Sequence, residues 1–208
     1  RFYFSLRSPY TWLAWRRTRL AAAKAGMQVE YVPVFPPPGM VNDPTKVPAK
    51  LEYIRHDVAR QARAYGLPCQ LPSEVDCEWV RPHAAFLFAL DRGRGCEFAD
   101  AALTARFERG ESLGDAAVIA CCAEQVGLDA QLVVAAQDEL ALQERVVLGM
   151  IRGATEDGLF GVPLFVLGSE RFWGNDRIEW LLRHLAERSG SAVPDLVANP
   201  LGPVLTAP

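Results

Sequence analysis

The chain has 208 residues, half of them hydrophobic and 23% charged, which is typical of a folded protein with a buried core and not of a disordered one. That length fits one domain, or one domain with a large insertion. A formal net charge of −3 excludes a chain that is basic throughout, as a nucleic-acid binder would be. No uncharged apolar run reaches the roughly 18 residues of a membrane-spanning helix, and no signal peptide is visible, so we expect a cytoplasmic protein.

The cysteines predict neither a disulfide framework nor a metal site. There are five of them, an odd number, and none form a CxxC pair. With only three histidines in the chain, no repeated ligand spacing for a metal appears. We therefore expect reduced, mostly buried thiols and no metal. The cysteines are Cys69, Cys77, Cys96, Cys121 and Cys122.

The first 35 residues have a strand–helix–strand pattern. Residues 1–6 are aromatic and apolar without a breaker, which predicts a short buried strand. A helix follows over 10–25, with Ser8 as its N-cap, proline in its first turn and Gly26 at its end. Residues 28–35 alternate and predict a second strand, so the chain opens as an α/β fold.

A long middle segment reads as helix throughout. It begins with a proline-rich loop over 36–48, and glycines separate the helices that follow. No strand and no internal repeat is evident in it. The predicted helices span 49–65, 79–91, 97–109, 113–124 and 130–156.

The α/β pattern then returns. Residues 163–167 predict a buried strand, a tight turn leads to a second strand over 171–173, and an amphipathic helix spans 176–188. This order predicts a thioredoxin-like α/β fold with a large all-helical insertion. The expected division is a discontinuous thioredoxin-like domain (1–48 and 158–190), a helical insertion (49–157) and an irregular tail (191–208).

Ser8 is the leading candidate for chemistry. It lies between the first strand and the first helix, where free backbone N–H groups and the helix dipole stabilise an anion. A thioredoxin-like oxidoreductase has its reactive cysteine there, which excludes dithiol exchange for this chain unless Cys121 or Cys122 takes part. A serine hydroxyl can instead donate a hydrogen bond to the thiolate of a cofactor. The alternative interpretation is a simple N-cap.

Two further sites flank the third and fourth strands. A cis bond between Val162 and Pro163 would leave the Val162 backbone free to pair with a peptide-like ligand, whereas a trans proline would be an ordinary strand entrance. Asn175 and Asp176 can cap the last helix, and they can also bind the ammonium or amide groups of a ligand.

Four segments, FYFSLRSPYTWLA, NDPTKVPAKLEYI, GLFGVPLFV and FWGNDRIEWL, occur in this order from Phe2 to Arg188. In sequence and spacing they resemble the 2-hydroxychromene-2-carboxylate isomerase family, whose relatives are the kappa-class glutathione transferases. The resemblance implies a thioredoxin-like fold with a helical insertion, reduced glutathione as cofactor, and a homodimer.

The resemblance also implies roles for individual residues. Ser8 would activate the glutathione thiol, and the Val162 backbone, ahead of cis-Pro163, would pair with the cysteinyl unit. Asn175 and Asp176 would hold the γ-glutamyl end.

The proline-rich loop region supplies two more residues by the same resemblance. Lys50 and Asn42 would lie at the glutathione site. The chain departs from the family at Ser5, where many members have aspartate, and at Arg7, where the usual residue is apolar or small.

The function implied is isomerisation of 2-hydroxychromene-2-carboxylate, or a similar conjugated aromatic keto acid, to the trans open-chain pyruvate, as in naphthalene catabolism. Reversible addition of a thiolate would make the double bond single and allow rotation. An anionic aromatic substrate needs a cation and apolar walls. The candidate cations are Arg7, Lys46, Lys50, Arg55 and His83, and the candidate walls are Tyr10, Phe35, Trp79 and Phe86. The alternatives are a kappa-like glutathione transferase or peroxidase, and a non-catalytic glutathione-binding module.

Overall fold

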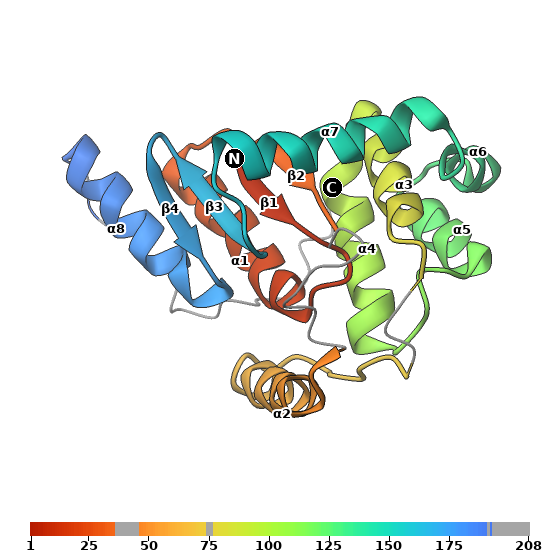
Figure 1. The fold of residues 1–208 in the computed structure, drawn as a ribbon, viewed down its shortest axis with the longest axis horizontal. Helices are drawn as coiled ribbons and strands as arrows, with labels where there is room; N and C mark the ends of the chain where they lie inside the picture. The colour runs from red at the N-terminus through yellow and green to blue at the C-terminus, as the bar shows by residue number, and fades with distance from the viewer. Residues whose placement is uncertain (36–45, 74–76, 191, 193–208) are drawn as a thin grey trace.

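The computed structural model describes residues 1–35, 46–73, 77–190 and 192. Its centre is a four-stranded sheet with the order β2-β1-β3-β4, in which β1 and β2 are parallel and the other two pairs are antiparallel (Figure 1). This confirms the predicted α/β fold. The strands are β1 (Phe2–Phe4), β2 (Tyr31–Pro33), β3 (Leu164–Leu167) and β4 (Glu170–Trp173). The candidate Asn42, and all of the predicted tail except Ala192, lie outside the described residues.

Helix α1 (Pro9–Ala25) begins and ends where the sequence predicts. The Ser8 side chain accepts a hydrogen bond from the Thr11 N–H, and proline occupies the first turn, where a missing N–H costs nothing. The helix ends at Gly26, whose φ of 62° is a left-handed conformation that glycine adopts without a Cβ clash.

The segment between β2 and β3 is helical over its described residues, as predicted, with one correction. The helix predicted over 130–156 is two helices, and the chain turns at 137–139. The buried Gln137 directs its carbonyl to the Gln143 side chain at 2.7 Å, and Glu139 is extended just before the next helix starts. The helices are α2 (Pro48–Ala64), α3 (Val80–Asp91), α4 (Gly95–Glu108), α5 (Ala116–Gln125), α6 (Ala130–Ala136) and α7 (Leu140–Glu156). Among the described helices, none combines the length and the apolar character needed to span a membrane.

The helical segment shares one core with the sheet. Phe4 of β1 packs against Trp15 of α1 and Phe86 of α3, each with ring centroids 4.9 Å apart. On the same face Phe2 stacks on Phe165 of β3 at 4.7 Å. Phe86 is fully buried in this core, so the expectation that it walls a substrate site is wrong.

The chain between β4 and the last helix differs from the prediction. A 3-10 turn, η2 (Asn175–Arg177), precedes α8 (Ile178–Ser189). Neither Asn175 nor Asp176 caps α8 through its side chain. The N-cap position of α8 is Arg177, and no side chain caps the helix there. Gly174 has a φ of 118°, a conformation that disfavours any residue with a Cβ.

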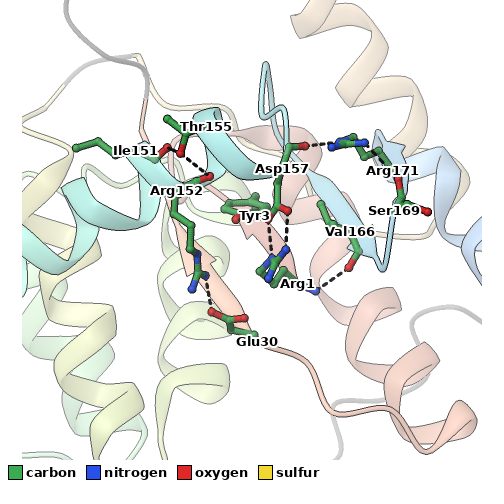
Figure 2. Close-up of polar contacts among 10 residues, drawn as sticks. All are labelled: Arg1, Tyr3, Glu30, Ile151, Arg152, Thr155, Asp157, Val166, Ser169 and Arg171. Atoms are coloured by element: carbon green, nitrogen blue, oxygen red, sulfur yellow. Dashed lines mark hydrogen bonds and ion pairs between the residues drawn. The ribbon is translucent and has the colours of Figure 1, made fainter.

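A polar cluster ties the end of α7 to the sheet, as Figure 2 shows. The buried Asp157 carboxylate accepts two hydrogen bonds from the Arg1 guanidinium, at 2.6 and 2.5 Å, and one from the Tyr3 hydroxyl at 2.5 Å. The Asp157 carbonyl accepts a further bond from Arg171 of β4. Burial would raise the pKa of Asp157, but the bonds from Arg1 and Tyr3 outweigh it, and its pKa lies below the ordinary value.

Candidate functional site

Loops from all four strands leave the same end of the sheet. The parallel pairing of β1 with β2 puts their carboxyl ends together. Tyr3 of β1 lies opposite Leu164 of β3, and Leu164 lies opposite Trp173 of β4. The residues just before β3 and just after β4 are therefore at this end too. The structure thus brings the start of α1, the Val162 loop and the Asn175 turn to the same end of the sheet.

Ser8 is half-buried at the first turn of α1. Its Oγ accepts the Thr11 N–H at 3.3 Å, and its own N–H donates to the Ser5 carbonyl at 3.0 Å. The described residues offer its hydroxyl hydrogen no acceptor. The N-cap role uses a lone pair of Ser8 and leaves the O–H available to donate toward an anion, so the cap does not exclude the functional interpretation.

His83 of α3 binds the backbone of the loop that carries Ser8. The His83 Nε2 accepts the Leu6 backbone N–H at 3.0 Å, and its Nδ1 donates to the Trp79 carbonyl at 2.6 Å. Because a backbone N–H only donates, Nε2 carries no hydrogen and Nδ1 does. Ser5 completes the support, since its Oγ accepts the Arg7 N–H at 3.3 Å.

His83 is unsuited to the cationic role expected of it. Its side chain is fully buried, and burial lowers its pKa to about 4, with the hydrogen bond to Trp79 only partly opposing this. At neutral pH the imidazole is uncharged. His83 therefore supports the loop around Ser8 and is not a cation for a substrate carboxylate.

The peptide bond between Val162 and Pro163 is cis, as the resemblance implies. The Pro163 carbonyl accepts the Gly174 N–H at 2.9 Å, which joins the start of β3 to the turn after β4. Within the described part of the chain, the Val162 backbone N–H and C=O have no hydrogen-bond partner. A half-buried backbone with free polar groups at the start of a strand can pair with an extended peptide.

Asn175 and Asp176 differ in environment. Asn175 is buried, and its Nδ2 donates to Gln61 Oε1 at 2.7 Å. The Asp176 carboxylate is 62% exposed and pairs with Arg177 at 2.7 Å. Asp176 is thus open to a ligand, whereas Asn175 is buried and one N–H of its amide already donates to Gln61.

Sequence reasoning missed a set of polar side chains on α2. Asp57 accepts the Tyr10 hydroxyl at 2.9 Å and the Gln61 amide at 2.8 Å, and Gln61 in turn bonds Asn175. Burial raises the pKa of Tyr10, and the Asp57 carboxylate raises it further, so the hydroxyl stays protonated and donates. Tyr10 was expected as a substrate wall, and its hydroxyl is engaged with α2. The available signal was the i, i+4, i+8 spacing of Asp57, Gln61 and Tyr65.

A second missed residue is the buried Arg17 of α1. Its Nη1 donates to the Asn175 carbonyl at 3.0 Å and to the Tyr65 hydroxyl at 3.2 Å, while its Nη2 pairs with Glu179 of α8. A buried arginine is rare unless it is paired. Arg17 therefore fixes the Asn175 turn against α1 and α8.

The other candidates are spread around this end of the molecule. Lys46, Lys50 and Arg55 are exposed at or near the start of α2, and Arg7 is half-buried. Trp79 is buried and belongs to the core, which argues against a role as a substrate wall. Aromatic and cationic side chains gather instead in an open groove of about 680 Å³ on β4 and α8. The groove is lined by Arg171, Phe172, Trp173, Arg177 and Trp180.

Burial makes three of the cysteines, Cys69, Cys96 and Cys122, poor nucleophiles. All five are free. Burial raises the pKa of Cys122 to about 12, and it also raises the pKa of Cys69 and Cys96. A raised pKa disfavours the nucleophilic thiolate. Cys121 and Cys122 lie on α5, among the helices farthest from β4 and α8 in Figure 1.

Comparison with known proteins agrees with this geometry. A family model described as the DsbA-like thioredoxin domain matches residues 1–186. The 2-hydroxychromene-2-carboxylate isomerase of Sphingobium xenophagum is 29% identical over 197 residues, covering 89% of this chain and 97% of that protein. A solved 2-hydroxychromene-2-carboxylate isomerase has a TM-score of 0.79 at 24% identity, covering 91% of this chain and 94% of that one. The cytosolic disulfide reductase DsbM of Pseudomonas aeruginosa, solved with GSH, has a TM-score of 0.63 at 19% identity, covering 88% and 97%. These matches confirm the thioredoxin-like fold and the resemblance.

Proposed function

The chain belongs to the DsbA-like thioredoxin family, and from that premise we propose that it is a glutathione-dependent isomerase. The substrate class is 2-hydroxychromene-2-carboxylate or a similar conjugated aromatic keto acid. The relatives named above support the isomerase activity. Glutathione is proposed as the cofactor because three suitable groups lie at the same end of the sheet. They are the Ser8 hydroxyl, the unpaired backbone of Val162 and the exposed Asp176 carboxylate.

The residues present fit glutathione in three places. The Ser8 hydroxyl, at the positive end of α1, can donate to a thiolate. The Val162 backbone can pair with the cysteinyl unit as a strand would. The exposed Asp176 carboxylate matches the ammonium of a γ-glutamyl group. DsbM, which shares the fold, has been solved with GSH, and this supports the same ligand here.

When bound, glutathione supplies a thiolate that adds reversibly to a conjugated double bond and so permits rotation about it. The protein's task is to favour the ionised thiol and to hold it still. The Ser8 hydroxyl and the positive end of the α1 dipole stabilise the negative charge. His83 and Ser5 keep the Ser8 loop in place through the Leu6 and Arg7 backbone N–H groups.

The test is conversion of 2-hydroxychromene-2-carboxylate, followed by its absorbance, with and without added reduced glutathione. We expect catalysis only with glutathione, whose concentration stays constant. Loss of glutathione in step with product would favour a transferase instead. A protein equally active without glutathione would refute the proposed cofactor.

Ser8→Ala should remove the activation and leave the fold intact. Losing one hydrogen bond to a charged group is worth about 1.5–3 kcal/mol, so the pKa of the bound thiol should rise by about 1 to 2. Thiolate absorbance of the protein–glutathione complex, titrated against pH, measures this directly. An unchanged titration in Ser8→Ala, with circular dichroism unchanged, would show that Ser8 is only an N-cap.

A further inference from the structure

Helix α2 has little apolar attachment to the rest of the molecule. Figure 1 shows it on the opposite side of the molecule from α7, beside the end of the sheet where the site lies. Of its 17 residues only Val58 and Ala62 are buried. Ile54 is partly buried against the same core, so α2 is held by a few apolar side chains together with polar contacts.

Those polar contacts form a continuous path between two parts of the site. Tyr10, two residues beyond Ser8, donates to Asp57 at 2.9 Å. Gln61 donates to the same Asp57 oxygen at 2.8 Å and accepts from Asn175 at 2.7 Å. We name these four residues, Tyr10, Asp57, Gln61 and Asn175, the α2 bridge.

The electrostatics of the bridge keep each donor and acceptor in its role. Three donated hydrogen bonds hold the pKa of Asp57 below its ordinary value, although burial acts in the other direction. The pKa of Tyr10 is raised, so its hydroxyl remains the donor. Asp57 is therefore a carboxylate that only accepts, and Gln61, which donates to it, must turn its oxygen to Asn175.

The Asn175 turn, which the bridge reaches, is also held through its backbone. Arg17 of α1 donates to the Asn175 carbonyl at 3.0 Å. That bond fixes the Asn175 backbone, while the bridge fixes its side chain. Asp176 is the next residue, so its position relative to Ser8 depends on both.

We propose that Asp57 and Gln61 are positioning residues that set the Asn175–Asp176 turn for the γ-glutamyl end of glutathione. This inference rests on the proposed function. Neither residue contacts the reacting atoms in this scheme. The bridge acts on ligand affinity, whereas Ser8 acts on thiol ionisation.

The test uses Gln61→Leu, which keeps the volume and removes both amide bonds. Asp57→Leu breaks the bridge at its centre, and Asp57→Asn restores it, because one amide oxygen can accept both the tyrosine and the glutamine. Arg60→Gln is the matched control, since Arg60 is 66% exposed and contacts Asp57 from outside the bridge. Hydrogen exchange across residues 175–177 in the free proteins shows whether the turn loosens and the rest of the fold holds.

Binding is measured by calorimetry with three thiols: glutathione, γ-glutamylcysteine and cysteinylglycine. We expect Gln61→Leu and Asp57→Leu to weaken the first two by about fivefold to tenfold, the effect of one lost hydrogen bond. Cysteinylglycine, which lacks the γ-glutamyl group, should bind all the variants equally. Asp57→Asn and Arg60→Gln should match the wild type, and the pKa of the bound thiol should stay unchanged in every variant.

Each other outcome is decisive. Wild-type affinity of Gln61→Leu for glutathione would overturn the positioning role and leave the proposed function standing. Equal weakening of all three thiols would mean general loosening, and would overturn it too. A wild-type protein that binds no glutathione would remove the proposed function and this inference with it.

Discussion

His83 makes the stability of the fold depend on pH over a defined range. Its pKa is lowered by burial from 6.5 to about 4. In the unfolded chain the same imidazole takes up a proton below about pH 6.5, while in the folded protein it stays neutral down to about 4. Protonation therefore favours the unfolded state, and stability falls as the pH drops through this window.

The size of the effect follows from the same numbers. A difference between 6.5 and about 4 corresponds to about 3 kcal/mol of unfolding free energy. That is a large share of the total for a domain whose stability is about 5–15 kcal/mol. Most of the loss should appear between pH 6.5 and 4, and this contribution should level off below pH 4.

Urea unfolding of the wild type and of His83→Gln at several pH values isolates the contribution. The glutamine Oε1 can accept the Leu6 N–H as Nε2 does, but it does not titrate. From pH 7 to pH 4 the free energy of unfolding of the wild type should fall by about 3 kcal/mol relative to that of His83→Gln. A difference that stays constant over this range would refute the neutral, buried imidazole. His83→Leu, which leaves the buried Leu6 N–H without a partner, should lose about 1–3 kcal/mol at pH 7.

Two further predictions concern the end of α7. Asp157→Asn should lower the free energy of unfolding in urea at pH 7 by about 2–4 kcal/mol, because the buried carboxylate joins Arg1 and Tyr3. Asp91→Asn breaks an exposed pair with Arg145 and should cost less than about 1 kcal/mol, so equal losses would contradict the role given to burial. Gly153→Ala should destabilise by about 1–2 kcal/mol, since its Cβ would lie 2.8 Å from Leu159 and 2.9 Å from the Tyr3 ring. The cost of these close contacts should exceed the roughly 1 kcal/mol that alanine gains over glycine in helix propensity. If Gly153→Ala instead unfolds at a higher temperature than the wild type, Tyr3 moves aside to make room.

The order of elements and the ends of α1 were predictable because local chemistry decides them. Ser8 and Gly26 are a cap and a stop whose effects extend over one turn. The break at 137–139 was not predictable in the same way. Apolar periodicity continues across it, and the bond from the Gln143 side chain to the Gln137 carbonyl leaves no repeating sequence pattern.

The site was predictable only in part, for a related reason. Ser8 and the Val162–Pro163 step lie beside strand ends, where the chain itself marks the position. The role of His83 depends on a contact between residues 77 positions apart, and that of Gln61 on one between residues 114 apart. Such pairings leave no local pattern, so a histidine that supports a loop could be mistaken for a substrate cation.

The support of Ser8 explains how a helical insertion can serve a site built on the sheet. Helix α3 contacts the Ser8 loop through the hydrogen bond between His83 and the Leu6 backbone. Helix α2 reaches both Tyr10 in the first turn of α1 and the turn after β4. Loops that rest on strand ends alone would lack these contacts. The insertion connects them, so substitutions in α2 or α3 should alter the site although neither helix carries the serine.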